Sequence, residues 1–157
     1  MPAQDFAITF EVAAAPAAVY AHLSDPQSYI GLSPLVVAVR EVHTEPGRVR
    51  YTAIERFPIG PLHWDNPLRV VMTFPEPGQR LVSDVHSPGW VHLVAATDLV
   101  AIPTGTRVTE SVHVTYPWLL GSFVLGQARS VQRKRAAELT RRMSGTSSAP
   151  AGTAPPS

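Results

Sequence analysis

Apolar and polar residues alternate along the first predicted element of the chain. From Phe6 to Val12 every second residue is apolar, a period typical of a β-strand with one buried face. Pro16 then stands where the first turn of a helix tolerates a proline, and apolar residues follow it at helical spacing. The run Ser24-Asp25-Pro26 ends this helix and supplies a cap and a first-turn proline for another helix. We therefore predict one strand followed by two short helices.

Turns rich in Gly and Pro divide the next part of the chain into six further segments with strand-like patterns. Pro67 lies inside the third of these segments and indicates an edge, bend or bulge, because proline cannot donate a hydrogen bond to a sheet ladder. Together with the first strand, the segments predict an antiparallel meander of seven strands joined by hairpins. The six predicted strands cover residues 35–42, 48–57, 62–74, 81–86, 90–102 and 107–116.

The last predicted element is a long helix over residues 118–143. Its apolar stripe needs a surface that buries it, and a curved antiparallel sheet supplies one. Residues 144–157 are rich in Ser, Gly, Ala and Pro and contain no charged or large apolar side chain, so we expect a disordered tail. The sequence thus predicts a single domain over residues 1–143. The stripe consists of Leu120, Val124, Ala128 and Val131, with Ala136, Leu139 and Met143 slightly rotated from it.

This order of elements resembles the START-like superfamily, also called SRPBCC, which includes polyketide cyclases and lipid-transport START domains. The resemblance is carried by the segments FEVAAAPAAVYAHLSDPQSY, GWVHL and GTRVTESVHVTYP and by the helix after Pro117. It implies an α+β helix-grip fold, in which a curved seven-stranded antiparallel sheet surrounds a long C-terminal helix and two short helices follow the first strand. Such a fold carries many functions, so function has to be argued from the site.

The composition excludes several classes of function. The sequence contains no cysteine, which rules out disulfides, thiolate metal sites and a cysteine nucleophile and suits a reducing cytoplasm. The N-terminus has no basic start followed by an apolar run, so no secretory signal is expected. No apolar stretch approaches the roughly 18 residues that a spanning helix needs. We expect a cytoplasmic protein without an integral membrane segment.

Positive charge is concentrated in the last predicted helix. Six basic residues and one glutamate give residues 129–142 a net charge of +5, so the remainder carries −4 within the total of +1. These cations can form a solvated helix face that favours the C-terminal end of the helix dipole, or attract an anionic ligand or lipid surface. No nucleic-acid partner is expected, because no aromatic platform accompanies the charge.

Strand alternation places two carboxylates among apolar positions. Glu55 shares the face of Tyr51 and Phe57, and Glu110 shares the face of the apolar residues in the last strand. A carboxylate that faces an interior needs a partner, and Arg135 lies close to the apolar stripe of the helix. Two alternatives stay open: Glu110 and Arg135 form only an internal salt bridge, or the strand end places Glu55 in water. The predicted ligand-cavity residues are Tyr51, Glu55, Trp64, Val70, His92, Glu110, Val112, Tyr116, Val124, Val131 and Arg135.

The six histidines do not stand at the spacing of helical metal ligands, so we predict no metal site and no cofactor. His86 and His92 flank the Ser-Pro-Gly turn and could meet across a hairpin. The apolar run from Trp118 to Phe123 has two interpretations. It is either core at the start of the helix or a gate at the cavity mouth, where it would allow transient contact with a membrane.

The favoured hypothesis for function is a non-catalytic carrier or sensor. It would bind a small hydrophobic ligand, lipid-like or polyketide-like, between the sheet and the last helix. The alternative is an enzyme similar to polyketide cyclase/dehydrase proteins that uses acids and bases of the cavity. Binding is favoured because the sequence shows no acid–base pair at convincing spacing, and no catalytic residue is assigned. The superfamily also contains modules that bind protein partners, but no sequence feature marks this chain as one. The sequence predicts neither the oligomeric state nor the ligand.

Overall fold

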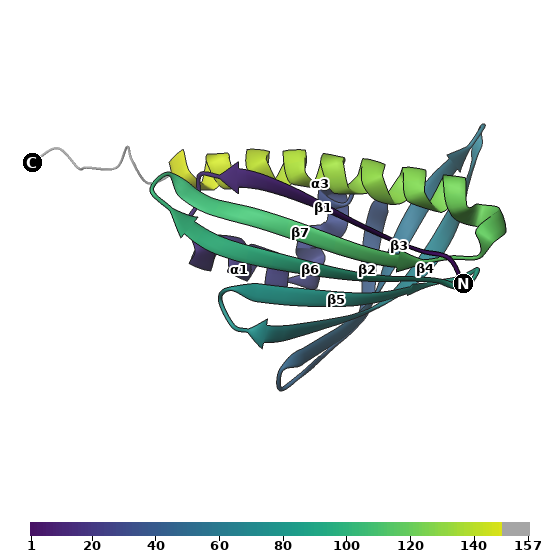
Figure 1. Cartoon of the computed structure of the whole chain (residues 1–157), viewed down its shortest axis with the longest axis horizontal. Helices are drawn as coiled ribbons and strands as arrows, with labels where there is room; N and C mark the ends of the chain where they lie inside the picture. The colour runs from purple at the N-terminus through teal and green to yellow at the C-terminus, as the bar shows by residue number, and fades with distance from the viewer. Residues whose placement is uncertain (149–157) are drawn as a thin grey trace, which may run out of the picture.

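All seven strands of the computed structural model, which describes residues 1–148, form a single curved antiparallel sheet (Figure 1). The strand order is β1-β7-β6-β5-β4-β3-β2, so each hairpin joins neighbours and only β1 pairs with a distant segment, β7. The fold is the predicted α+β helix grip. The strands are β1 (Ala3–Val12), β2 (Val36–Glu45), β3 (Arg48–Ile59), β4 (Leu62–Glu76), β5 (Arg80–Ser87), β6 (Val91–Ile102) and β7 (Gly105–Thr115).

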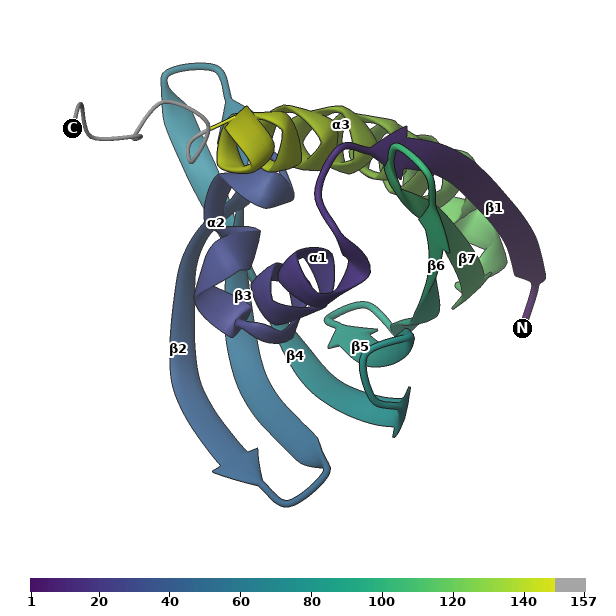
Figure 2. The same ribbon diagram turned by 90° about the vertical axis from the view of Figure 1, so that its left-hand side faces the viewer.

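The helices lie on the concave side of the sheet (Figure 2). The long helix α3 closes the open side between the two edges of the sheet, while α1 and α2 fill one end. The Asp25 side chain caps the turn after α1 by accepting a hydrogen bond from the backbone N of Gln27 at 3.0 Å, as the sequence predicts. The helical elements are α1 (Pro16–Ser24), the 3-10 turn η1 (Pro26–Ser28), α2 (Tyr29–Leu32), the 3-10 turn η2 (Trp118–Leu120) and α3 (Gly121–Ser148).

Several strand boundaries shift by up to three residues, and the helices differ from the sequence prediction more clearly. The predicted second short helix is divided into η1 and α2, and Gly31 inside α2 has a positive φ of 78°. The long helix continues past Met143 to Ser148, since adding residues to an existing helix costs little. The rest of the predicted tail, residues 149–157, lies outside the described residues.

Pro67 lies where β4 has only one hydrogen-bonded neighbour. It is the register partner of Ile54 on β3, whereas the pairing of β5 with β4 ends at the pair His86 and Arg69. The β3–β4 hairpin therefore extends past β5, and the missing N–H of the proline interrupts no ladder on that side. The sequence-based prediction of an edge position is confirmed.

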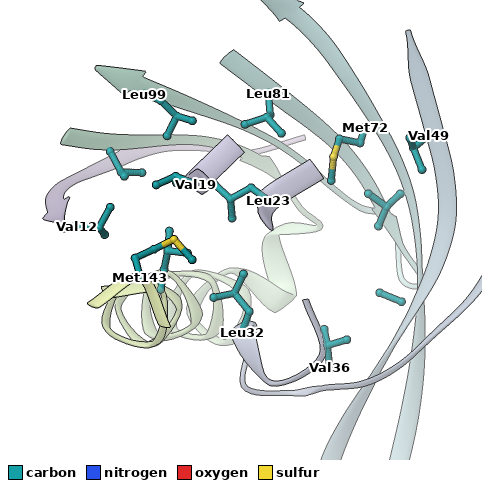
Figure 3. Close-up of a cluster of buried hydrophobic side chains, with 14 of the residues drawn as sticks. Val12, Val19, Leu23, Leu32, Val36, Val49, Met72, Leu81, Leu99 and Met143 are labelled. Atoms are coloured by element: carbon teal, nitrogen blue, oxygen red, sulfur yellow. The ribbon is translucent and has the colours of Figure 1, made fainter. Parts of the chain in front are cut away.

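The hydrophobic core occupies the end of the molecule where α1, α2 and the last turns of α3 meet the sheet (Figure 3). Val19 and Leu23 of α1 pack here with Met72 of β4, and Met143 contributes the end of α3. The Thr106 hydroxyl at the start of β7 donates to the carbonyl of Ala14 at 2.7 Å, which holds the start of α1 against the sheet. A smaller buried cluster of Val112, Val114 and Tyr116 lies apart from this core, and the cavity described below borders both clusters.

Candidate functional site

A cavity of about 570 Å³ lies between α3 and the concave face of the sheet. This volume is within the range of pockets that enclose small molecules. Most of the lining is apolar, because the inward positions of each strand carry aliphatic or aromatic side chains. The apolar lining includes Ala53 and Phe57 from β3, Leu68 and Val70 from β4, Val85 from β5, Leu93 and Ala95 from β6, Val112 and Val114 from β7, and Val124, Ala128 and Val131 from α3.

Nine of the eleven sequence-predicted residues line this cavity, and two do not. Each predicted residue on β3, β4, β7 and α3 is in place, while His92 and Tyr116 lie elsewhere. Whether these side chains contact a ligand stays a prediction. The nine are Tyr51, Glu55, Trp64, Val70, Glu110, Val112, Val124, Val131 and Arg135.

His92 does not face the cavity, so its assignment to the site is wrong. Its neighbours Val91 and Leu93 line the cavity, and the alternation of β6 sends His92 to the outer face of the sheet. There its Nε2 lies 2.8 Å from Oδ1 of Asp84. Tyr116 has the inward phase and is buried, but it packs beneath the start of α3. A Cβ atom on Gly121 would come within 2.9 Å of the Tyr116 ring. Tyr116 therefore supports the wall without lining it.

Glu110 and Arg135 form an ion pair inside the domain, as the sequence predicts. Arg135 donates from Nε to Oε2 of Glu110 at 3.2 Å and from Nη2 to Oε1, and its Nη1 donates to the Ser33 hydroxyl at 3.2 Å. Gln132 donates to the backbone carbonyl of Glu110 at 3.2 Å. Burial, the largest influence, lowers the pKa of Arg135, but the charge and hydrogen bonds of Glu110 outweigh it and leave the pKa above its usual value. The Arg135 guanidinium is thus held in its charged form against the Glu110 carboxyl.

Two tyrosines lie beside this ion pair. The Tyr29 hydroxyl donates to the carbonyl of Leu23 at 2.9 Å, and its ring stacks against Tyr51 with 6.4 Å between centroids. Burial raises the pKa of both phenols well above the usual value, so both stay neutral. No hydrogen bond joins the Tyr51 hydroxyl to any residue that the structure describes, which leaves it able to bond a molecule in the cavity.

Glu55 is the other carboxylate of the cavity, and it makes no direct ion pair within the described residues. Its Oε1 accepts a hydrogen bond from Nδ2 of Asn66 at 3.3 Å, and the same amide donates to the Ser87 hydroxyl at 3.0 Å. Burial raises the pKa of Glu55, while the Asn66 hydrogen bond and the charge of Arg135 oppose this only in part. Sequence reasoning missed Asn66. One feature of the sequence identifies Asn66 as a cavity candidate: it is the one polar side chain among the even-numbered, otherwise apolar residues of the predicted strand 62–74.

The start of α3 and the β3–β4 hairpin lie at the end of the molecule opposite α1 (Figure 1). There Trp64, Leu120 and Phe123 both line the cavity and are exposed, so we place the cavity mouth at this end. The Phe57 ring stacks on Trp64 with 5.5 Å between centroids and lies 6.4 Å from the ring of Phe123. Leu120 approaches Gly89 of the β5–β6 loop. We call the exposed side chains of these three segments the apolar rim: Ile59, Leu62, Trp64, Trp90, Trp118, Leu119, Leu120 and Phe123.

The apolar rim contains all three tryptophans of the chain, and they are 49%, 82% and 74% exposed in sequence order. Segments 57–64, 88–91 and 117–128, which build the rim, contain no Asp, Glu, Lys or Arg. The interpretation of Trp118 to Phe123 as core is therefore wrong for its large side chains, because all four of them are exposed. A charge-free exposed patch of this kind marks an interaction site or the entrance to a binding site.

The basic charge of α3 has a partly structural role. Arg142 donates to the backbone carbonyls of Ser28 at 2.7 Å and Ile30 at 3.1 Å, which ties α3 to η1 and α2. Hydrogen bonds from Arg141, the largest influence, and from Arg142 lower the pKa of Glu138 to about 2. The exposed cations Arg133 and Lys134 lie on the solvent side of the helix.

The family described as polyketide cyclase/dehydrase and lipid transport matches residues 3–144. The chain belongs to this family. None of the curated proteins compared with it matches significantly. None of the helices in residues 1–148 is long and apolar enough to cross a membrane. Membership in this family and the fold confirm the resemblance to the START-like superfamily.

Solved structures with the same fold support this assignment at low sequence identity. An aromatase/cyclase from a Streptomyces species is 14% identical with a TM-score of 0.70, over 92% of this chain and 98% of its own. A START superfamily protein from Mycobacterium smegmatis is 13% identical with a TM-score of 0.66, over 89% and 99%. The di-domain aromatase/cyclase of the steffimycin pathway is 14% identical with a TM-score of 0.74, over 92% of this chain. The match spans only 52% of that longer protein.

Proposed function

We propose that the protein is a carrier that binds a small hydrophobic molecule, lipid-like or polyketide-like, in the cavity beneath α3. The observation that carries this proposal is the apolar lining of the 570 Å³ cavity together with its opening through the uncharged apolar rim. Family membership supports the same reading, since the family is described by both lipid transport and polyketide chemistry. A sequence without cysteine supports a cytoplasmic setting.

The polar groups of the cavity define the part of the ligand that they can bind. Glu110 and Arg135 satisfy each other, so neither offers a free charge to an ionic headgroup. The Tyr51 hydroxyl and the Glu55 carboxyl can bond a hydroxyl or a carbonyl group, and the uncharged side chains of Ser83, Thr97 and Gln127 also line the cavity. The ligand class is therefore a neutral amphiphile with a large apolar body. Burying about ten methylene groups would contribute about 8 kcal/mol before the cost of ordering the ligand.

A carrier is favoured over a sensor by the apolar rim. Tryptophan prefers the interface between membrane and water, and Trp90 and Trp118 are each exposed over most of their surface at the cavity mouth. We propose that the apolar rim contacts a bilayer transiently while the ligand enters. Because all tryptophans lie in this rim, vesicles of phosphatidylcholine should shift the intrinsic fluorescence of the protein to shorter wavelength. An unchanged spectrum at high lipid concentration would remove the membrane contact and leave cavity binding in place.

The proposed cavity binding has a direct test in matched variants of α3. Val131 lines the cavity, whereas Ala137 of the same helix is exposed. Native mass spectrometry of protein purified from its own host should detect a retained ligand in the parent chain and in Ala137→Phe. Val131→Phe, which fills part of the cavity, should carry much less. Equal ligand content in Val131→Phe, or a parent chain that never carries a molecule, would overturn the proposal.

A polyketide cyclase/dehydrase-like enzyme is the second candidate, and Glu55 is the observation that favours it. A carboxyl with a raised pKa inside a cavity is suited to general acid–base chemistry near neutral pH. The test is incubation with a polyketide synthase that releases an uncyclised chain, followed by chromatography of the products. A product that forms with the parent chain and is lost in Glu55→Gln would favour the enzyme over the carrier. An unchanged product pattern would remove this candidate.

A further inference from the structure

Three side chains with metal-ligating atoms lie together on the outer face of the sheet, away from the cavity. Asp84 and His86 stand two residues apart on β5, and His92 lies on β6. Val85 and Leu93, which alternate with them, line the cavity, so these three positions face outward. We call Asp84, His86 and His92 the outer cluster.

The β5–β6 hairpin fixes the outer cluster in place. His86 and His92 are direct register partners, and the hairpin closes through Pro88, Gly89 and Trp90. The pairing sets the imidazole rings side by side, with 4.3 Å between centroids and 5° between planes. Because the strand ladder holds both backbones, the two rings are brought together without any rearrangement of the chain.

The donor atoms of the outer cluster converge. Oδ1 of Asp84 lies 2.8 Å from Nε2 of His92 and 3.1 Å from Nε2 of His86. All three donor atoms lie within 4.8 Å of one another. Donors that bind one Zn²⁺ ion at about 2.0–2.2 Å stand roughly 3–3.5 Å apart, close to the two distances to Asp84, and the stacked imidazoles have to rotate so that both nitrogens face one ion.

The chemistry of the outer cluster suits a late divalent transition ion. Two imidazoles and a carboxylate are a nitrogen–oxygen donor set that Zn²⁺ and its neighbours prefer, whereas Mg²⁺ and Ca²⁺ prefer oxygen alone. The side chains of Asp84, His86 and His92 are 44%, 57% and 37% exposed, so water can complete the coordination. Arg69, the register partner of His86 on β4, is the cation closest in the strand register, and its charge opposes binding.

We propose that the outer cluster binds one Zn²⁺ ion that bridges β5 and β6. The ion would lie between the imidazole nitrogens of His86 and His92 and the Asp84 carboxylate, in place of their direct contacts. It would join the two strands just before the loop that carries Trp90, one of the rim residues. The sequence predicts that His86 and His92 could meet across a hairpin, but it predicts no metal site, because no spacing along the chain shows that Asp84 joins them. This proposal is independent of the proposed carrier function.

The test is calorimetric titration of the untagged full chain with ZnCl₂ near neutral pH in a buffer that does not chelate metals. We expect one ion per chain and a loss of at least about tenfold in affinity for both His86→Ala and His92→Ala. His113→Ala is the matched control, since His113 is also a half-exposed outer histidine bonded to a carboxylate, that of Asp5. Its affinity should match that of the parent chain. Arg69→Gln should bind Zn²⁺ more tightly, because an opposing charge is removed.

Two results would overturn the proposal: no saturable binding of Zn²⁺, or binding that the double variant His86→Ala/His92→Ala retains. Circular dichroism of each variant checks folding, and the exposed positions should leave the spectrum unchanged. Where binding is seen, ¹H–¹⁵N spectra of the imidazoles add a readout besides affinity. The ring signals of His86 and His92 should both shift on titration, and those of His113 should not.

Discussion

At the scale of single residues, the two carboxylates of the cavity differ in their partners. Glu110 is held by the guanidinium of Arg135, so its charge is compensated where water is excluded. Glu55 has only the Asn66 amide as a direct partner. One carboxylate is therefore a structural group, and the other is available to a ligand or to proton transfer. Separate substitutions of the two should have different consequences.

Removal of one member of the Glu110–Arg135 pair should cost more than removal of both. Arg135→Met leaves a buried carboxylate without a cation, at a cost of about 3–5 kcal/mol in the free energy of unfolding. The double variant with Glu110→Gln should recover part of this loss, as measured by chemical denaturation. The matched control is the exposed bidentate pair Arg56–Asp65. A double-mutant cycle on this pair should give a coupling energy of only about 0.2–1 kcal/mol. Additive effects for Glu110 and Arg135 would contradict the coupling.

Because of Glu55, the free energy of unfolding should decrease as pH rises. Because burial raises the pKa of Glu55, the folded chain keeps its proton to a higher pH than the unfolded chain, whose pKa is near the ordinary value of 4.5. Between these two pKa values the folded state binds more protons, so the free energy of unfolding decreases with pH and then levels off. Glu55→Gln should remove this decrease and be the more stable chain at neutral pH. Denaturation curves across this pH range measure it, with the exposed Glu76→Gln as control. An identical pH profile for Glu55→Gln and the parent chain would refute the prediction.

At the scale of elements, α3 contributes both to the core and to the cavity. Its last turns bring Leu139 and Met143 into the core, its middle brings Val131 to the cavity, and its first turn belongs to the apolar rim. The helix therefore has different neighbours along its length. Two glycines near its start, Gly121 and Gly126, differ in whether another side chain packs against them.

Alanine should have opposite effects at Gly121 and Gly126. At Gly126 a Cβ meets nothing within 4 Å, so Gly126→Ala should stabilise the protein by about 0.5–1 kcal/mol through helix propensity. At Gly121 the same Cβ would lie 2.9 Å from the buried ring of Tyr116, so either the ring or the helix has to shift. Gly121→Ala should therefore lose the gain from propensity and destabilise the chain. Thermal unfolding of the two variants side by side tests this, and equal stabilisation by both would show that Tyr116 can move freely.

At the scale of the whole molecule, the core with α1 and α2 lies at one end and the apolar rim at the other (Figures 1 and 3). The cavity lies between them, and Leu23, Tyr51 and Leu139 belong to both the core and the cavity lining. The interior next to the core is thus left incompletely filled, which costs packing energy that a bound molecule can restore. Met143 is the last buried apolar residue of α3 within the described chain.

A chain that ends at Ser144 should keep the stability of the full chain. It retains the whole core through Met143 and loses only the last turn of α3 among the described residues. The expected change in unfolding free energy is within about 0.5 kcal/mol, the norm for positions without buried contacts. Chemical denaturation of the two chains measures it. A chain that ends at Glu138, which lacks Leu139 and Met143, is the contrast and should lose several times that amount. A large loss for the Ser144 chain would mean that later residues contact the domain.

The positions of the strands and the inward face of most of them follow from the sequence alone. Where polar residues occupy every second position of a strand, they identify its outer face. For this reason the sequence correctly predicts that Glu55 and Glu110 face inward. Both faces of β6 are largely apolar, so alternation does not show which face points to the cavity. The sequence prediction therefore places His92 on the wrong face of the sheet. The sequence analysis does not include Asn66, because the sequence does not show which residue a polar side chain on an apolar face bonds to.

Tertiary structure alone decided which distant residues meet and where the sheet ends. The sequence offers Arg135 as a partner for Glu110, but whether the two meet depends on the depth of each residue along its element, which alternation does not encode. The exposure of Trp118 and Phe123 depends on the point where α3 passes beyond the sheet. Local periodicity reports which side of an element is apolar, since it reflects burial of neighbouring positions. Alternation therefore predicts most of the residues that line the cavity, whereas the apolar rim and the place of Asp84 in the outer cluster arise from contacts between elements.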